Sequence, residues 1–315
     1  MIITRFFDKT GNAKQRRLTM HYILYNTLSG NKQGLEYSRL LLGNHVSADA
    51  KLVDLSSIKS YADLWAGIDL ENDTVVLSGG DGTLNRFINE NHGLTLPKNL
   101  FYFASGSGND FKKDVDQDGQ ALIPLHQYIS DLPTVTVNGK TSYFINGIGY
   151  GIDGYCCEEG DKLKAKSDKP VDYTAIAIKG LLFHFKPTNA KITVDGVTKE
   201  YKKVWIAPTM KGRYYGGGMF VTPEQDRFDP EGKVSCAVLH GSSALKTLIV
   251  FPSIFKGEHV KHTEMVEIRT GHEITVEFDR PTALQIDGET VLGVTSYTVK
   301  SGKLASKKEC VAAEV

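Results

Sequence analysis

The stretch SGGDGTLN, residues 78–85, decides the fold. It follows the β-rich run TVVLS and precedes a segment that places Leu84, Phe87 and Ile88 on one helical face. A turn between a buried strand and a helix is where a parallel sheet presents an anion-binding loop. Glycine permits positive φ and, lacking a side chain, lets backbone N–H groups approach a phosphate. We therefore expect a phosphate-binding loop, because a purely structural turn usually needs one glycine and this one has three.

Strand-like and helix-like patterns alternate on both sides of this loop. The strand-like runs are residues 22–25, 51–55 and 100–104, and the helix-like runs are residues 33–42 and 58–67. This alternation predicts βαβ units, and hence a mostly parallel sheet with helices on both faces. We expect an α/β domain over residues 20–134.

After about residue 134 the sequence changes to short β-patterned runs separated by turn signals. Asn138-Gly139 and Asp195-Gly196 favour hairpins, because both turn positions need positive φ. Further β-patterned runs cover residues 204–208, 234–239, 266–270 and 274–278. The near-continuous apolar residues 171–185 predict a helix, either packed against the sheets or forming a wall of an acyl-chain pocket. We expect a β-sandwich domain over residues 135–309.

Composition excludes several classes of protein. A chain of 315 residues has room for about two domains. Its apolar runs fall short of the ~18 to 20 residues that span a bilayer. Lysine plus arginine and aspartate plus glutamate both number 37, so we expect no nucleic-acid partner. Four cysteines without a C-x-x-C motif, and an N-terminus without signal-peptide order, indicate reduced thiols in a cytoplasmic protein.

Two further motifs give little support for a binding site. A literal G-x-G-x-x-G occurs at Gly149, Gly151 and Gly154, but residues 155–160 lack the amphipathic helix pattern that a dinucleotide-binding unit needs. No Walker P-loop occurs anywhere. His259 and His262 form an H-x-x-H without a third ligand, which is typical of solvated or packed histidines.

Six motifs resemble those of one enzyme family. GGDGT at residues 79–83 resembles the signature shared by diacylglycerol-kinase-type lipid kinases, NAD kinases and, more distantly, phosphofructokinases. ASGSGNDF at residues 104–111 looks like the P-x-G-T-x-N-D-F segment of the diacylglycerol kinase catalytic family, with alanine for proline and serine for threonine. YNTLSG at residues 25–30 is similar to that family's N-P-x-S-G, with Thr27 in place of the proline. Residues 144–153, 214–223 and 284–289 resemble its F-x-N-x-x-G-x-G-x-D, G-G-G…P and D-G-E motifs.

These motifs stand in the family's order over roughly residues 20 to 290, whereas NAD kinases share only the first. The resemblance implies an α/β nucleotide-binding domain, a β-sandwich domain, and ATP in the cleft between them. It implies Mg²⁺-dependent phosphoryl transfer to a lipid hydroxyl, on diacylglycerol or a related lipid. The implied partners are the lipid substrate and a membrane surface, which a cytoplasmic protein would reach transiently. A homodimer is left open.

Roles follow from the motifs that match. The nucleotide is expected to contact Asn26, Ser29, Gly79, Gly80, Asp81, Gly82, Thr83, Asn85, Gly106, Ser107 and Asn109. Asp81 and Asp110 each follow a predicted strand and could converge on Mg²⁺ through water, since Mg²⁺ favours one or two carboxylates and keeps much of its hydration. Asp110 alternatively fits an N-cap or an Asx-turn.

Asp287 reads from the sequence alone as a hairpin turn. It matches the family's proposed general base, which implies a catalytic role, with Glu289 as a metal or orienting partner. Asp226 and Asp229 look like the family's D-x-x-D-G structural-magnesium loop, but Pro230 and Glu231 intervene before the glycine.

Two alternatives remain open. One is an NAD-kinase-like kinase of a soluble substrate, and the other is a nucleotide-binding regulator that has lost catalysis. If the substrate is a lipid, membrane binding should be peripheral. The candidate contacts are residues 175–185 and the lysines Lys162, Lys164, Lys166 and Lys169, which alternate with acids and also fit a solvated loop.

Overall fold

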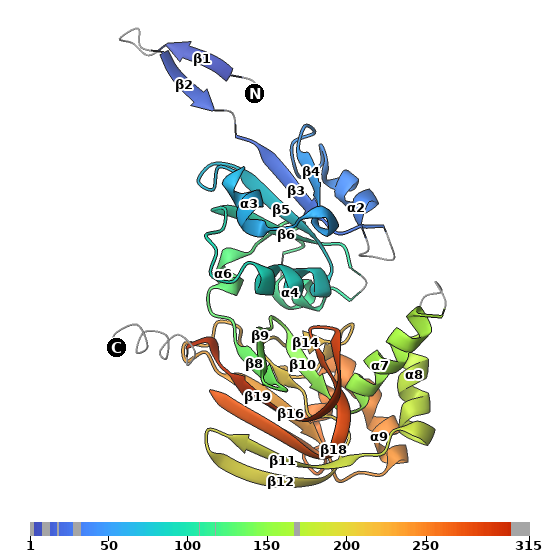
Figure 1. Ribbon diagram of the computed structural model, residues 1–315. Coiled ribbons are helices and arrows are strands. Elements are labelled where there is room, and N and C mark those ends of the chain that lie inside the picture. The colour runs from blue at the N-terminus through green and yellow to red at the C-terminus, as the bar shows by residue number, and fades with distance from the viewer. Residues whose placement is uncertain are drawn as a thin grey trace. The chain divides into compact units, whose positions relative to one another are not determined.

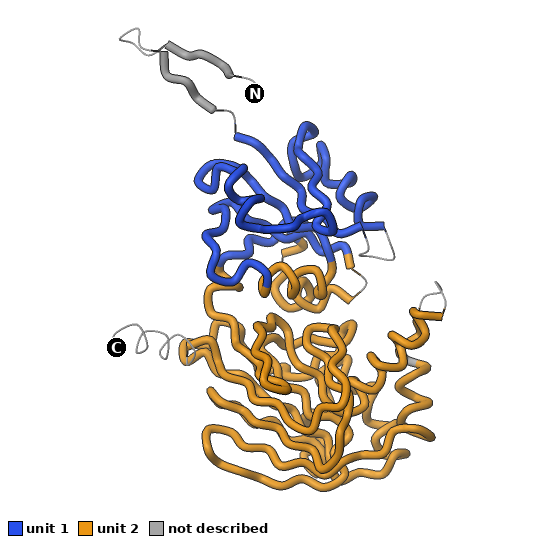
Figure 2. Tube along the Cα trace, in the orientation of Figure 1, with its two compact units in different colours: residues 1–79, 90–105, 120–126 blue, residues 80–89, 106–119, 127–315 orange. Residues whose placement is uncertain are grey.

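The computed structural model describes residues 3–7, 13–17, 19–27, 33–106, 108–116, 118–166 and 171–303. Contacts divide the chain into two units (Figure 2). The first comprises residues 1–79, 90–105 and 120–126, and the second comprises residues 80–89, 106–119 and 127–315.

The first unit is built on a five-stranded sheet with strand order β4-β3-β5-β6-β7 (Figure 1). Strands β3 (His21–Tyr25), β4 (Lys51–Asp54), β5 (Thr74–Gly79) and β6 (Asn99–Ala104) are parallel, and β7 (Ile123–Pro124) joins β6 antiparallel. The other elements that begin in this unit are β1 (Ile3–Phe7), β2 (Ala13–Arg17), α2 (Gly34–Leu41), η1 (Leu55–Ser57), α3 (Tyr61–Ala66) and α6 (His126–Ile129). The predicted parallel α/β architecture is confirmed.

The burial of the central strand β5 explains its continuous apolar sequence. Val75, Val76 and Leu77 are completely buried. A parallel strand covered on both faces needs a continuous apolar run rather than an alternating one. On one side Val76 joins a core with Ile23 of β3 and Leu41 of α2.

The second unit contains a ten-stranded antiparallel sheet with the main order β17-β16-β13-β10-β18-β19-β8-β9. Its strands are β8 (Thr134–Val137), β9 (Lys140–Tyr143), β10 (Gly147–Tyr150), β11 (Thr188–Val194), β12 (Val197–Val204), β13 (Thr209–Met210), β16 (Val234–Leu239), β17 (Val266–Gly271), β18 (Glu273–Ile286) and β19 (Glu289–Lys300). A separate hairpin joins β14 (Tyr214–Tyr215) to β15 (Met219–Phe220). The predicted β-sandwich-like second domain is confirmed.

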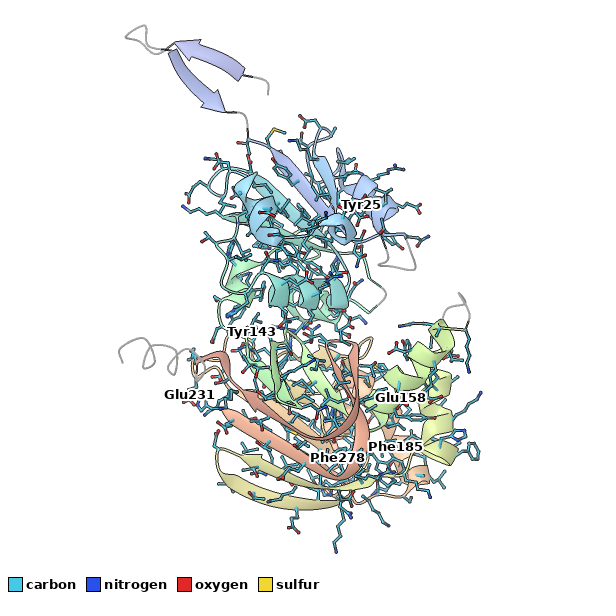
Figure 3. All side chains as sticks on the ribbon, viewed as in Figure 1. Tyr25, Tyr143, Glu158, Phe185, Glu231 and Phe278 are labelled. Carbon is cyan, nitrogen blue, oxygen red and sulfur yellow. The ribbon has the colours of Figure 1, made fainter. Side chains whose placement is uncertain are left out.

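Strand β18 serves both parts of this sheet. Its first half pairs with β11, its last residues pair with β10, and its pairing with β19 shifts register between Glu277 and Leu284. The apolar side chains of both halves enter one core, which includes Phe278 (labelled in Figure 3). Tyr150 stacks on Phe278 with ring centroids 3.8 Å apart. The expected hairpins form at Asn138-Gly139 and Asp195-Gly196, and all four of these residues have positive φ.

The helical elements of the second unit are α4 (Asp81–Glu90), α5 (Asp110–Val115), α7 (Ile152–Lys164), α8 (Tyr173–Lys179), the π-helix η2 (Gly180–His184), α9 (Ala244–Val250), η3 (Phe251–Lys256) and η4 (Glu258–Lys261). The predicted helix over residues 171–185 is thus α8 followed by η2.

Helix α7 corrects one expectation, since residues 155–160 were interpreted as too irregular for a helix. Its amphipathic signal is weak because Gly154 and Gly160 lie on its buried face. A Cβ on Gly154 would stand 2.0 Å from the Ala283 carbonyl oxygen, and one on Gly160 would stand 2.6 Å from the Tyr173 ring. The preceding strand β10 is antiparallel to both neighbours, so the G-x-G-x-x-G motif serves close packing, as the rejection of a Rossmann role predicted.

Candidate active site

Gly80 of the first motif is required by a close backbone approach. A Cβ on Gly80 would lie 3.0 Å from the Gly106 Cα, and a Cβ on Gly106 would lie 2.5 Å from the Gly80 Cα. Neither Gly80 nor Gly82 has a left-handed φ, so the expected positive φ in this loop is wrong. The two loops that carry the GGDGT and GSGND residues therefore touch main chain to main chain.

Asp81 joins these two loops through its carboxylate. Its Oδ2 accepts the Asp110 N–H and its Oδ1 accepts the Phe111 N–H, both at 3.0 Å. These N–H groups belong to the first turn of α5, where no intrahelical acceptor exists. Asn109, in the left-handed region with φ 53°, makes no side-chain cap, and its Oδ1 accepts the Gly106 N–H instead. Asp81 thus caps a helix 29 residues further along the chain.

Asp110 is buried beside Asp81 with one oxygen unused. Its Oδ2 accepts the Gly217 N–H at 2.8 Å, and its Oδ1 has no hydrogen-bond partner among the described residues. A Cβ on Gly108 would lie 3.4 Å from Asp81 Oδ2 and 3.7 Å from Asp110 Oδ2, so both carboxylates line one spot. Burial raises the pKa of Asp110 to about 6; the Gly217 N–H opposes this rise and the charge of Asp81 adds to it.

Asp287 occupies the turn between β18 and β19 with φ 45°, and its carboxylate is saturated with hydrogen bonds. Oδ1 accepts the N–H groups of Asn146 and Gly147, both at 2.9 Å. Oδ2 accepts the Ile145 N–H at 2.7 Å and the Asn85 side-chain amide at 2.9 Å. Burial raises the pKa of Asp287, and these four hydrogen bonds oppose the rise.

Asn146 connects this turn with the first motif. Its side-chain amide donates to Asp81 Oδ1 at 3.0 Å, while its own N–H donates to Asp287. Asp81, Asp110 and Asp287 are therefore linked through neighbouring groups, although they are up to 206 positions apart in the sequence. Glu289, two residues after Asp287, is exposed, and its Oε1 would lie 3.4 Å from a Cβ on Gly82.

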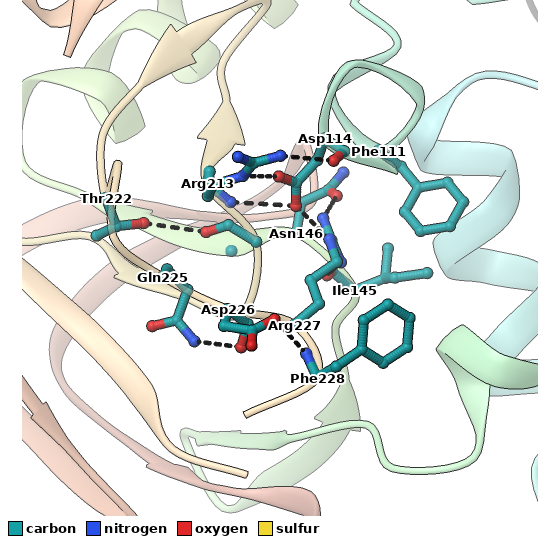
Figure 4. A network of polar contacts seen from close by, with 12 residues as sticks. Phe111, Asp114, Ile145, Asn146, Arg213, Thr222, Gln225, Asp226, Arg227 and Phe228 are labelled. Atoms are coloured by element: carbon teal, nitrogen blue, oxygen red, sulfur yellow. Dashed lines mark hydrogen bonds and ion pairs between the residues drawn. The ribbon is translucent and has the colours of Figure 1, made fainter. Parts of the chain in front are cut away.

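A second polar network is centred on the buried Asp114 of α5 (Figure 4). The Arg213 Nε contacts Asp114 Oδ1 at 2.6 Å, and Arg227 pairs with Oδ2. Arg227 also donates to the Ile145 carbonyl at 2.5 Å and to Asn146 Oδ1 at 2.7 Å. Arg227 thus links α5 to residues 145 and 146, whose N–H groups bind Asp287, while Arg213 binds Asp114.

The Asp226 and Asp229 carboxylates accept turn N–H groups. Asp226 Oδ1 accepts the Phe228 N–H at 2.8 Å, and the two oxygens of Asp229 accept those of Glu231 and Lys233. Over the described parts of the chain, no three acidic, histidine or cysteine side chains gather as a metal site needs. The structural Mg²⁺ expected at Asp226 and Asp229 stays a prediction.

The remaining predicted residues are distributed as follows. Asn26 follows β3 and Gly79 ends β5, both in the first unit, and Thr83 is buried in α4. Ser29, Ser107 and Lys169 lie outside the described residues. Asn85, expected to contact nucleotide, donates to Asp287 and to the Tyr143 carbonyl. His259 is completely buried and its Nε2 bonds to the Val221 carbonyl, as predicted for a packed histidine.

Sequence reasoning gave no role to Asn146, Asp114, Arg213 or Arg227. Asn146 had a signal, because it is the conspicuous polar residue of the F-x-N stretch. The other three had none, since their partners lie 81 to 113 positions away.

The chain belongs to the diacylglycerol kinase catalytic-domain family. The model "Diacylglycerol kinase catalytic domain" matches residues 20–136, and "YegS C-terminal NAD kinase beta sandwich-like domain" matches residues 146–304. The Mycobacterium tuberculosis protein named diacylglycerol kinase is 25% identical over 226 residues, which cover 69% of this chain and 70% of that protein.

Solved structures share the fold. A structure described as a diacylglycerol kinase from Bacillus anthracis has a TM-score of 0.56 and 16% identity, covering 90% of this chain and 93% of that one. Another chain from the same strain has a TM-score of 0.63 and 17% identity, covering 94% and 96%. In the described residues, no helix has the length and apolarity to cross a bilayer.

Proposed function

We propose that the protein transfers the γ-phosphate of ATP, as the Mg²⁺ complex, to the hydroxyl of a lipid such as diacylglycerol. The observation that carries this proposal is the linked set Asp81, Asn146, Asp110 and Asp287. Phosphoryl transfer needs charge neutralisation at the phosphates and a group that accepts the hydroxyl proton. Mg²⁺ held by carboxylates beside a glycine-rich loop would supply the first, and a further carboxylate would supply the second.

The donors at Asp81 and Asp110 fit Mg²⁺. The unpartnered buried Oδ1 of Asp110 needs a donor or a cation, since buried polar atoms are nearly always satisfied. Mg²⁺ is bound by one or two carboxylates and keeps several waters. When bound, it would neutralise charge on the phosphates. The chain's own part is to hold the two carboxylates together, through Gly108, Gly217 and the α5 N–H groups.

Asp287 and Glu289 supply the proton acceptor in this proposal, and their surroundings favour a division of roles. Each carboxylate oxygen carries about two acceptor positions, so four donors leave Asp287 none for a substrate hydroxyl. Asp287 then positions residues 145–147. Glu289 is exposed beside Gly82 and is free to meet a hydroxyl, which favours it as the acceptor. The assignment of the base to Asp287 from the family motif stays a prediction, and the two assignments behave differently in variants.

Thin-layer analysis of label transferred from radioactive ATP to a panel of lipids tests this proposal. We expect label on a lipid hydroxyl with the wild type and none with Asp110→Asn, which keeps an acceptor for Gly217 but loses the charge. NAD is included as a soluble acceptor. Label on NAD alone would support the soluble-substrate alternative, and ATP binding in calorimetry without any transfer would support the regulator.

A further inference from the structure

Two surface segments of the second unit expose large apolar side chains. They are residues 173–186, which form α8 and η2, and residues 244–257, which form α9 and η3. Together they make up less than a tenth of the chain. Seven of the thirteen large apolar side chains exposed in the described residues lie on them: Tyr173, Ile178, Leu182, Phe183, Leu245, Ile249 and Phe255. This concentration distinguishes the segments from a surface with scattered apolar residues.

The two segments adjoin one another. Residues of η2 and α9 are in contact, and Figure 1 shows α8 and α9 side by side. Their inward residues, Leu181 and Phe185 from one and Val250 and Ile254 from the other, enter the same hydrophobic core. The outward side chains are not part of that core. We call the outward residues Ile178, Leu182, Phe183, Leu245, Ile249 and Phe255 the apolar face.

The charged side chains within the two segments have one sign. The segments contain the lysines Lys179, Lys186, Lys246 and Lys256 and no aspartate or glutamate, in a chain whose formal net charge is zero. Three acids near the segments have partners, and one of these partners, Lys246, belongs to the segments. Asp172 caps α8, Glu258 pairs with Lys261, and Glu264 pairs with Lys246. Lys179, Lys186 and Lys256 have no described carboxylate within ion-pair distance.

The combination of exposed apolar side chains and lysines favours one kind of binding partner for the apolar face. Exposed phenylalanine, leucine and isoleucine with lysines and no acids is the composition of segments that lie on anionic membranes. A second copy of this chain would meet the face with the same face, because a two-fold interface is isologous. Lysines would then oppose lysines, which disfavours that arrangement.

We propose that the apolar face binds the surface of an anionic lipid bilayer, with Phe183 and Ile249 entering the acyl-chain boundary. Phe183 is 77% exposed and Ile249 is 71% exposed. Lys179, Lys186 and Lys256 contact the anionic headgroups. The inference deepens the proposed function, because a lipid kinase must reach a substrate that resides in a bilayer.

Vesicle flotation without nucleotide tests the inference. The wild type should bind vesicles containing phosphatidylglycerol more tightly than pure phosphatidylcholine vesicles, and salt should weaken the binding. Phe183→Ser and Ile249→Ser should each lower the partition coefficient about tenfold or more, because each removes apolar area from the buried contact. Lys179→Gln and Lys256→Gln should each lower it about fivefold on phosphatidylglycerol only. Val197→Ser is the matched control, since Val197 is 66% exposed on the β11–β12 hairpin, and should bind as the wild type does.

Three outcomes would overturn the inference. They are a wild type that does not bind phosphatidylglycerol vesicles, equal binding by the wild type and Phe183→Ser, and a sedimenting dimer that Phe183→Ser dissociates. The proposed function is checked separately with diacylglycerol dispersed in detergent micelles. There Phe183→Ser should transfer phosphate at the wild-type rate. A protein that binds vesicles through this face but phosphorylates no lipid would refute the kinase proposal alone.

Discussion

Replacing Asp287 and Glu289 by their isosteric amides separates a positioning carboxylate from a proton acceptor. In Asp287→Asn the amide nitrogen faces two hydrogen-bond donors whichever way the amide is turned, because each oxygen of Asp287 accepts two. A buried donor left without an acceptor costs about 1–3 kcal/mol. Removing a buried charge offsets part of this, so we expect a net loss of about 2–3 kcal/mol. For a unit of this size that lowers the Tm by roughly 5–10 °C.

Glu289→Gln should leave the Tm within about 2 °C, because an exposed side chain contributes little to stability. Its kcat for phosphate transfer to lipid should fall by ~10²–10⁴, which is the usual contribution of a general base, with the KM for ATP nearly unchanged. Calorimetric melting and initial rates on both variants provide the two measurements. If Asp287→Asn lost that factor at an unchanged Tm while Glu289→Gln stayed at the wild-type rate, Asp287 would be the base and the division of roles would be refuted.

Three further variants test the packing around this site. Gly80→Ala should lower both the Tm and the calorimetric affinity for ATP, because its Cβ meets the Gly106 Cα at 3.0 Å; Gly82→Ala, whose Cβ meets only the flexible end of Glu289, should preserve the Tm, and equal melting of the two would contradict the close approach. Burial raises the pKa of Asp153 to about 6, so the folded state binds its proton more tightly and this group's contribution to stability falls as the pH rises from about 4 to 6. Asp153→Asn should therefore stabilise the protein at pH 7 by up to about 3 kcal/mol in urea unfolding, and a difference from wild type that did not shrink at pH 4 would contradict this. Arg227→Met should lower the Tm by about 10 °C because it breaks a buried ion pair, whereas Arg280→Met, at an exposed arginine, should not.

The fold was predictable where the pattern is local. The β5 run and the Asn-Gly and Asp-Gly turns carry their structure within a few residues, and each formed as expected. Helix α7 was not predictable, because its buried face includes glycines at contacts made with Ala283 and Tyr173. A hydrophobicity pattern scores such glycines as breaks, although they are the residues that let the helix pack closely.

The candidate site was predictable as a set of residues but not as an arrangement. The motifs identified Asp81, Asp110 and Asp287, yet the positive φ expected for the glycine loop is absent. What requires Gly80 is Gly106, a residue 26 positions away whose approach no local pattern encodes. Asn85 was grouped with the nucleotide-binding residues because it follows GGDGT, whereas its amide serves Asp287, 202 positions distant.

Arg227 is the clearest example of a residue whose role the sequence does not reveal. From sequence it is only the residue between two aspartates of an acidic turn, and attention goes to its neighbours as metal ligands. In the structure those neighbours bond to their own turn, and the guanidinium extends to Asp114, Ile145 and Asn146. A permanent cation thus joins a buried carboxylate to two acceptors on residues 145 and 146, whose N–H groups bind Asp287. The position of Asp287 then depends on an arginine, and Arg227→Met should disturb it.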